Sequence, residues 1–165
     1  MRHFAPKQPP SPTSTEKVAE WAGSKKPAKK RSSTVSDSKL IEALDEAERL
    51  LEAGTFEAEA KPMHFVAIYA DLYTRVYNTP PIDLGPRERL FAARLAKDLL
   101  HKDFGGSPSG LADFVSWTWT REKGRVKWRQ ENGRPPSRIS WRVQFGRSLL
   151  ADYRVAKATV SKELR

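Results

Sequence analysis

Apolar residues recur at helical spacing in five stretches of the chain, and this periodicity predicts a mainly α-helical fold. Residues that favour helix ends stand at the borders of these stretches. Asp37 is a candidate N-cap, Gly54 a candidate stop, Pro86 fits a first helical turn, and Ser148 can cap the last stretch. The predicted helices cover residues 37–54, 63–78, 86–103, 110–132 and 148–158.

The first predicted helix has one apolar face and one acidic face. The ordinary interpretation is a solvated acidic face over a packed stripe. The alternative is a helix that masks the protein's own basic surface or mediates self-association. Residues 55–62, which follow this helix, are interpreted as a linker. The apolar positions of the stripe are Leu40, Ile41, Leu44, Ala47, Leu50 and Leu51.

Residues 124–145 fit two different structures. In the first, Ser107 or Ser109 caps a fourth helix that runs to Asn132, with Gly133 as a left-handed residue at its end. In the second, the helix stops earlier and Asn132-Gly133 forms the turn of a basic β-hairpin, because apolar and polar residues alternate on the return strand. Three helices followed by such a hairpin resemble a winged helix in element order. We favour the helix, because Arg-Glu-Lys and Lys-Trp-Arg-Gln-Glu are good helix formers.

Composition divides the chain into four segments. Residues 1–36 carry Pro, Ser, Thr and Lys without apolar periodicity, so they bury too little surface to offset their ordering entropy, and a disordered tail is predicted. Residues 37–60 hold the acidic helix and the linker. Residues 61–158 can supply the core of a helical domain, and residues 159–165 are predicted to be a flexible C-terminus. The predicted fold is therefore a small domain of about five helices preceded by a disordered tail.

Charge is distributed unevenly along the chain. The formal net charge is +10, made up of +6 for residues 1–36, −6 for 37–60, +2 for 61–105 and +8 for 106–165. A chain that is basic at both ends suggests a polyanionic partner, most often nucleic acid and less often an anionic membrane surface.

The composition also indicates the cellular compartment in which the protein is expected. The absence of Cys excludes disulfides and thiolate metal sites and fits a reducing environment. No apolar run approaches the roughly 18 residues of a membrane span, and the N-terminus lacks the apolar core of a signal peptide. We therefore expect a soluble protein without a membrane partner, cytoplasmic in a bacterium or phage-infected cell and nuclear in a eukaryote.

The C-terminal half combines tryptophan with arginine and lysine. In the long-helix interpretation, Trp117 and Trp128 are eleven residues apart and so share a face with Arg121 and Arg125, whereas Trp119 falls on a separate, core-like stripe. The cations would attract phosphate. The aromatic rings have three possible roles: they stack on bases, pack in the core, or form cation–π contacts with arginines of the same chain. The candidate nucleic-acid-binding residues are Trp117, Arg121, Lys123, Arg125, Lys127, Trp128, Arg129, Arg134, Arg138 and Arg142.

The tail holds a second basic cluster. It resembles a nuclear localisation signal and equally a DNA-contacting arm, and the plain alternative is a solvated linker. Its candidate auxiliary contacts are Lys25, Lys26, Lys29, Lys30 and Arg31.

Other chemical motifs are weak. Ser107-Pro-Ser-Gly110 opens a helix whose free N–H groups could hold a phosphate, but it lacks the Gly-Lys-Ser/Thr ending of a P-loop. The histidines are isolated, and His64 and His101 at helix ends fit capping or charge roles. We predict no cofactor, no metal site and no catalytic residue, although scattered carboxylates can serve a metal-dependent nuclease.

These observations favour a non-enzymatic nucleic-acid-binding protein, with DNA preferred over RNA. Its size, basicity and Trp/Arg-rich C-terminal half are typical of accessory proteins for replication, recombination or transcription in phages or mobile elements. The alternative is an adaptor that docks the Trp/Arg surface onto a larger replication or transcription protein, because Trp, Tyr and Arg also dominate protein interfaces. A small metal-dependent hydrolase is the third hypothesis.

Overall fold

The computed structural model describes residues 34–164, and every regular element in this part of the chain is a helix. The mainly helical fold class is confirmed. Two short helices that the sequence did not predict are α3 (Phe56–Glu59) and α7 (Trp141–Phe145). The five predicted helices are present as α2 (Asp37–Ala53), α4 (Pro62–Tyr77), α5 (Glu88–Lys102), α6 (Pro108–Glu131) and α8 (Leu150–Glu163).

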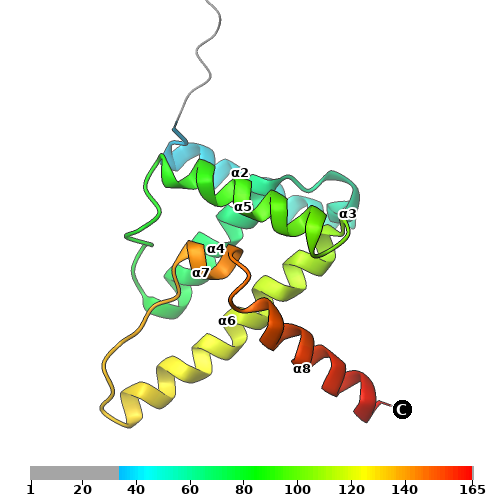
Figure 1. The fold of residues 1–165 in the computed structure, drawn as a ribbon. Coiled ribbons are helices and arrows are strands. Elements are labelled where there is room, and N and C mark those ends of the chain that lie inside the picture. The colour runs from blue at the N-terminus through cyan, green and yellow to red at the C-terminus, as the bar shows by residue number, and fades with distance from the viewer. Residues whose placement is uncertain (1–33, 165) are drawn as a thin grey trace, which may run out of the picture. The chain divides into compact units, whose positions relative to one another are not determined.

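Helix α4 is the centre of the packing. It contacts α2, α5 and α6, while α5 contacts α7, and α6 contacts α3 and α8 (Figure 1). Phe65 and Tyr69 of α4 and Phe114 of α6 are completely buried, so the large side chains of the core lie mainly where α4 meets its neighbours. None of the described helices combines the length and the apolarity needed to cross a bilayer.

The start of α2 differs from the prediction. Ser36, not Asp37, is the N-cap, because the Asp37 carboxylate pairs with Arg89 of α5 instead. Arg89 also donates to the carbonyl of Val35 at 2.8 Å, and Val35 is buried. Val35 and Ser36, at the end of the predicted tail, therefore contact the helical domain. The rest of that tail lies outside the described residues, including Lys25, Lys26, Lys29, Lys30 and Arg31.

Several apolar residues within the predicted helices are exposed, among them Val155 (67 %) and Trp128 (55 %). Ile41 is 61 % exposed, Leu51 52 % and Phe91 53 %. The buried stripes of α2 and α5 are narrower than the apolar pattern suggests, and alanines such as Ala47 and Ala96 form their centres. Small side chains let these helices approach α4 closely, which leaves the flanking large residues outside the contact.

The predicted linker at residues 55–62 contains α3. Phe56 is buried and packs edge-on against Phe65, with ring centroids 5.7 Å apart. The Phe56 ring therefore anchors this segment to α4, a contact that the local sequence pattern does not reveal.

A carboxylate of the same chain occupies the N-terminus of α6. Ser107 caps the helix, as predicted, with its Oγ accepting from the Gly110 N–H at 3.2 Å. Glu57 of α3 accepts hydrogen bonds from the Ser109 backbone N–H, at 2.8 Å, and from the Ser109 hydroxyl. The helix end that the sequence offered as a phosphate site thus already holds an anion.

Glu57→Gln is expected to lower the melting temperature near neutral pH. Hydrogen bonds from the Ser109 side chain and backbone lower the pKa of the Glu57 carboxyl below its ordinary value. A carboxyl with a lowered folded pKa stabilises the native state above its unfolded pKa, and this contribution disappears as the pH falls through the folded pKa. The melting-temperature difference from the wild type should therefore shrink between about pH 7 and about pH 3. Glu59→Gln is the matched control, and a Glu57→Gln difference that does not change with pH would contradict the assignment.

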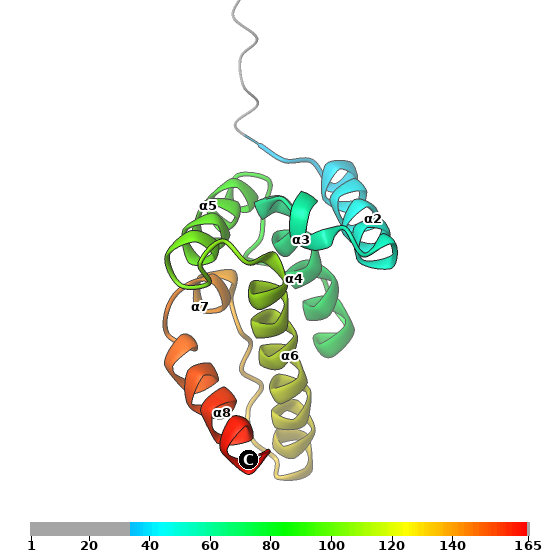
Figure 2. The ribbon, with the colours of Figure 1, turned by 90° about the vertical axis from the view of Figure 1, so that its right-hand side faces the viewer.

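The long-helix interpretation of residues 110–132 is confirmed. α6 continues without a break to Glu131, and Gly133 follows with a left-handed φ of 59°. The alternative hairpin does not form in the described chain. Residues 134–140 instead run back beside α6 without regular structure and enter α7 (Figure 2). Ser140 caps α7 by accepting from the Val143 N–H at 3.3 Å, so the apolar alternation after it reflects a helical turn.

The last helix starts later and ends later than predicted. Leu149 is its N-cap, and Ser148, the predicted cap, donates to the Val143 carbonyl at 3.4 Å. α8 continues to Glu163, into the residues predicted to be flexible. Leu150 and Tyr153 are its buried residues, so its first turns hold it on the core.

Candidate nucleic-acid interface

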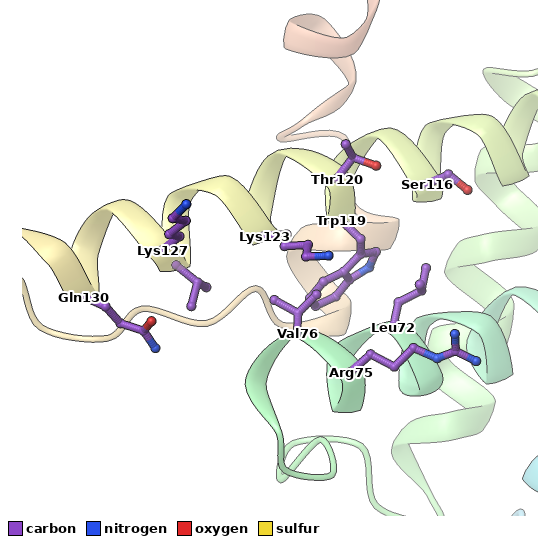
Figure 3. A pocket seen from close by; sticks show the side chains of 10 residues that line it. Leu72, Arg75, Val76, Ser116, Trp119, Thr120, Lys123, Lys127 and Gln130 are labelled. Atoms are coloured by element: carbon purple, nitrogen blue, oxygen red, sulfur yellow. The ribbon is translucent and has the colours of Figure 1, made fainter.

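Two adjoining grooves lie between α4 and the C-terminal half of α6. The first groove has a volume of about 490 Å³ and the second about 360 Å³, and they share Val76, Val126 and Gln130. Figure 3 shows side chains of α6 facing those of α4 across the first groove. Its lining residues are Leu72, Arg75, Val76, Ser116, Trp119, Thr120, Lys123, Val126, Lys127 and Gln130. The second groove is lined by Val76, Tyr77, Val126, Arg129, Gln130, Arg134, Pro136, Ser137 and Arg138.

Every charged residue that lines these grooves is a cation. Two of them have a carboxylate on the same helix: Arg75 pairs with Asp71 at 2.9 Å and Lys127 with Glu131 at 3.9 Å. Lys123 forms no ion pair with any described residue. A row of charges of one sign along a groove attracts polyanions over several ångströms. The lining cations are Arg75, Lys123 and Lys127 in the first groove and Arg129, Arg134 and Arg138 in the second.

The floor of the grooves is apolar and aromatic. Trp119 is only 2 % exposed, which confirms its predicted place in the core. Its ring meets those of Tyr69, Tyr73 and Tyr77 edge-on, with centroids 5.5 to 5.9 Å apart. The tyrosine stripe of α4 therefore fixes α6 to the core at the level of the first groove.

Partly buried hydrogen bonds attach the returning segment, which forms one wall of the second groove, to α4. The Tyr77 hydroxyl donates to Glu122 Oε1 at 2.9 Å and accepts from the Ile139 N–H at 2.8 Å, while the Tyr69 hydroxyl donates to the Ile139 carbonyl at 3.0 Å. Burial raises the pKa of Tyr77, and Glu122 raises it further, so the hydroxyl stays protonated and able to donate. Both backbone groups of Ile139 are thus bonded to α4.

Two arginines that line the second groove are held in place by their contacts with the returning segment and with α4. Arg129 donates to the Ser137 carbonyl at 3.0 Å, which fastens the returning segment to α6. The Arg138 guanidinium lies 5.8 Å from the centroid of the Tyr77 ring, a cation–π distance. The positions of these two cations are therefore set by α4 and α6 rather than by a free loop.

Trp117 and Arg121 lie on another side of α6, next to α8. The Trp117 ring packs against Tyr153 of α8 at 5.4 Å, and Arg121 lies over the Trp117 ring at 5.3 Å while its guanidinium meets Asp152 at 3.3 Å. This is the structural cation–π arrangement that the sequence left as one of two explanations. Neither residue lines the grooves.

The remaining candidates are dispersed. Arg125 lies 4.0 Å from the buried Glu122. Trp128 is 55 % exposed near the end of α6, and Arg142 lies over the Trp141 ring of α7 at 5.1 Å. Of the residues chosen from the sequence, the structure brings together Lys123, Lys127, Arg129, Arg134 and Arg138.

The sequence missed the contribution of α4. Leu72, Arg75 and Val76 form the opposite wall of the first groove. Arg75 stands alone in its helix, and no local pattern distinguishes it from an ordinary solvated cation. The only available signal was the Tyr stripe of α4, which marks the packing edge beside which Arg75 emerges.

Comparison with known proteins assigns no family. Neither a protein-family model, nor a curated protein, nor a solved structure matches the chain. Among residues 34–164, no three His, Cys, Asp or Glu side chains lie together in an arrangement that could hold a metal ion.

Proposed function

We propose that the protein binds nucleic acid through the two grooves between α4 and α6, as a non-enzymatic accessory protein. The observation that carries this proposal is the lining of the grooves: six cations, no carboxylate, and a floor of apolar and aromatic side chains. Phosphates supply the negative charge that such a surface attracts, and bases supply flat apolar faces that fit its floor.

The support comes from the arrangement of the charges as well as their sign. Lys123 and Lys127 are four residues apart on α6, so they project from one face about 6 Å apart along the helix axis. Arg129 and Arg138 continue the row into the second groove, where their hydrogen bond and ring contact fix them. Preset cations lose less side-chain entropy when they contact a phosphate backbone.

The salt dependence of binding tests this proposal. If all six groove cations contact phosphates, the slope of log K against log salt should be about −4 for a single strand and about −5 for a duplex. Purified, nuclease-treated protein is titrated against labelled single- and double-stranded DNA, and against RNA of the same sequence, by fluorescence anisotropy. We expect the protein to bind DNA more tightly than RNA of the same sequence.

Two outcomes would overturn the proposal. One is the absence of binding to any of these strands at low salt. The other is binding with a slope near zero, because contacts between cations and phosphates release counterions and must weaken as salt rises.

A further inference from the structure

The first groove contains a buried hydrogen-bond donor without an acceptor. Trp119 Nε1 has no hydrogen-bond partner among residues 34–164, although the side chain is only 2 % exposed. The indole N–H can only donate, and a buried donor left unpaired costs free energy. No acceptor of the described residues, including the hydroxyls of the neighbouring tyrosines, lies within hydrogen-bonding reach of this N–H.

The surroundings of this N–H suit a flat ligand. Leu72 and Val76 on α4 face Val126 on α6, so the walls on either side are aliphatic, and the volume of about 490 Å³ falls within the range of about 300–1,000 Å³ typical of ligand pockets. Figure 3 shows Leu72 beside the indole. Exposed lining side chains such as Lys123 rotate within picoseconds to nanoseconds, which lets an acceptor approach the floor of the groove.

The cations at the rim of the first groove favour a ligand that carries negative charge. Lys123 lies about one turn and Lys127 about two turns beyond Trp119 on α6, and Arg75, paired with Asp71, lines the groove from α4. An inorganic anion would use the cations but not the aliphatic walls. A ligand that uses both needs a flat apolar body, an acceptor on its edge and an attached anion, and a nucleotide within a strand has all three.

We propose that the first groove takes an unpaired base of a single strand, with an acceptor on the base edge bound to Trp119 Nε1–H and the adjoining phosphates bound to Lys123 and Lys127. The inference rests on the proposed function and specifies its ligand as single-stranded nucleic acid. Every nucleobase carries an edge acceptor, so the groove accepts all bases. A duplex must first extrude a base from its stack, which weakens its binding relative to the single strand.

Abasic strands separate base insertion from phosphate attraction. A labelled oligodeoxynucleotide is compared with a strand of equal length in which every base is removed and every phosphate kept. We expect the base-bearing strand to bind about tenfold more tightly than the abasic strand. It should also bind more tightly than its own duplex at equal salt. Equal affinities for the base-bearing and abasic strands would overturn base insertion while leaving the proposed function intact, and binding of neither strand would overturn the proposed function itself.

A groove-filling variant locates the effect. Thr120→Trp places a bulky ring in the first groove from an exposed position, and Thr159→Trp makes the same change on the exposed surface of α8. Thr120→Trp should abolish the difference between base-bearing and abasic strands, whereas Thr159→Trp should keep it. Retention of the difference in a folded Thr120→Trp variant would place the base elsewhere.

The indole resonance of Trp119 gives a direct readout. In a ¹H–¹⁵N spectrum the Trp119 Nε1–H signal should shift downfield when the base-bearing strand is added, because the proton gains an acceptor, and should stay nearly in place with the abasic strand. An identical response to both strands would remove this hydrogen bond from the proposal.

Discussion

The Trp119→Ala variant should lose about 3–5 kcal/mol of the free energy of unfolding. The indole is 2 % exposed and contacts three tyrosine rings of α4, so its removal leaves a cavity at the junction of α4 and α6. A typical domain is stable by about 5–15 kcal/mol. The variant should therefore be partly or wholly unfolded at physiological temperature, as measured by urea denaturation followed by circular dichroism.

Trp128→Ala is the matched control for this prediction. It makes the same substitution on the same helix at a side chain that is 55 % exposed, so its stability should stay close to that of the wild type. Near-identical stability of the two variants would contradict the placement of Trp119 at the centre of the packing.

The sequence predicted helix ends correctly where the capping residue interacts only with its own helix. Ser107 caps α6 and Gly133 ends the turn after it in the left-handed conformation, as their residue types require. The same kind of signal failed at Asp37, whose carboxylate is drawn to Arg89 of another helix and leaves the cap to Ser36. A competing partner 52 residues away is invisible in a local pattern.

The candidate site shows the same limit more clearly. Helical spacing put Trp117 and Trp128 on one face, yet α8 packs on Trp117 and leaves Trp128 exposed. Lys123 and Lys127 were found because most lysines on a helix stay exposed, whichever face of the helix packs. Arg75 was missed because it lines the groove only when α4 lies beside α6, and this tertiary arrangement cannot be read from the local sequence.

The unpaired Trp119 Nε1–H could not be derived from sequence either. A tryptophan on a core stripe is expected to satisfy its donor within the fold. Only the positions of the surrounding side chains, none of which offers an acceptor within reach, show that it does not. Whether a buried donor finds an acceptor depends on how several elements meet, which a local sequence pattern does not contain.

Charge reversal in the first groove tests the central claim most directly. Lys123→Glu with Lys127→Glu is compared with Lys97→Glu plus Lys162→Glu, an equal change in net charge at exposed positions of α5 and α8 that line neither groove. At about 50 mM salt each phosphate contact contributes roughly tenfold to affinity through counterion release, so losing two should weaken single-strand binding about 100-fold. Stability should change little in either variant, because all four lysines are exposed. The account predicts a loss of about 100-fold in the groove variant and a much smaller loss in the control. Equal losses in both variants would show that binding follows net charge alone and would contradict a site between α4 and α6.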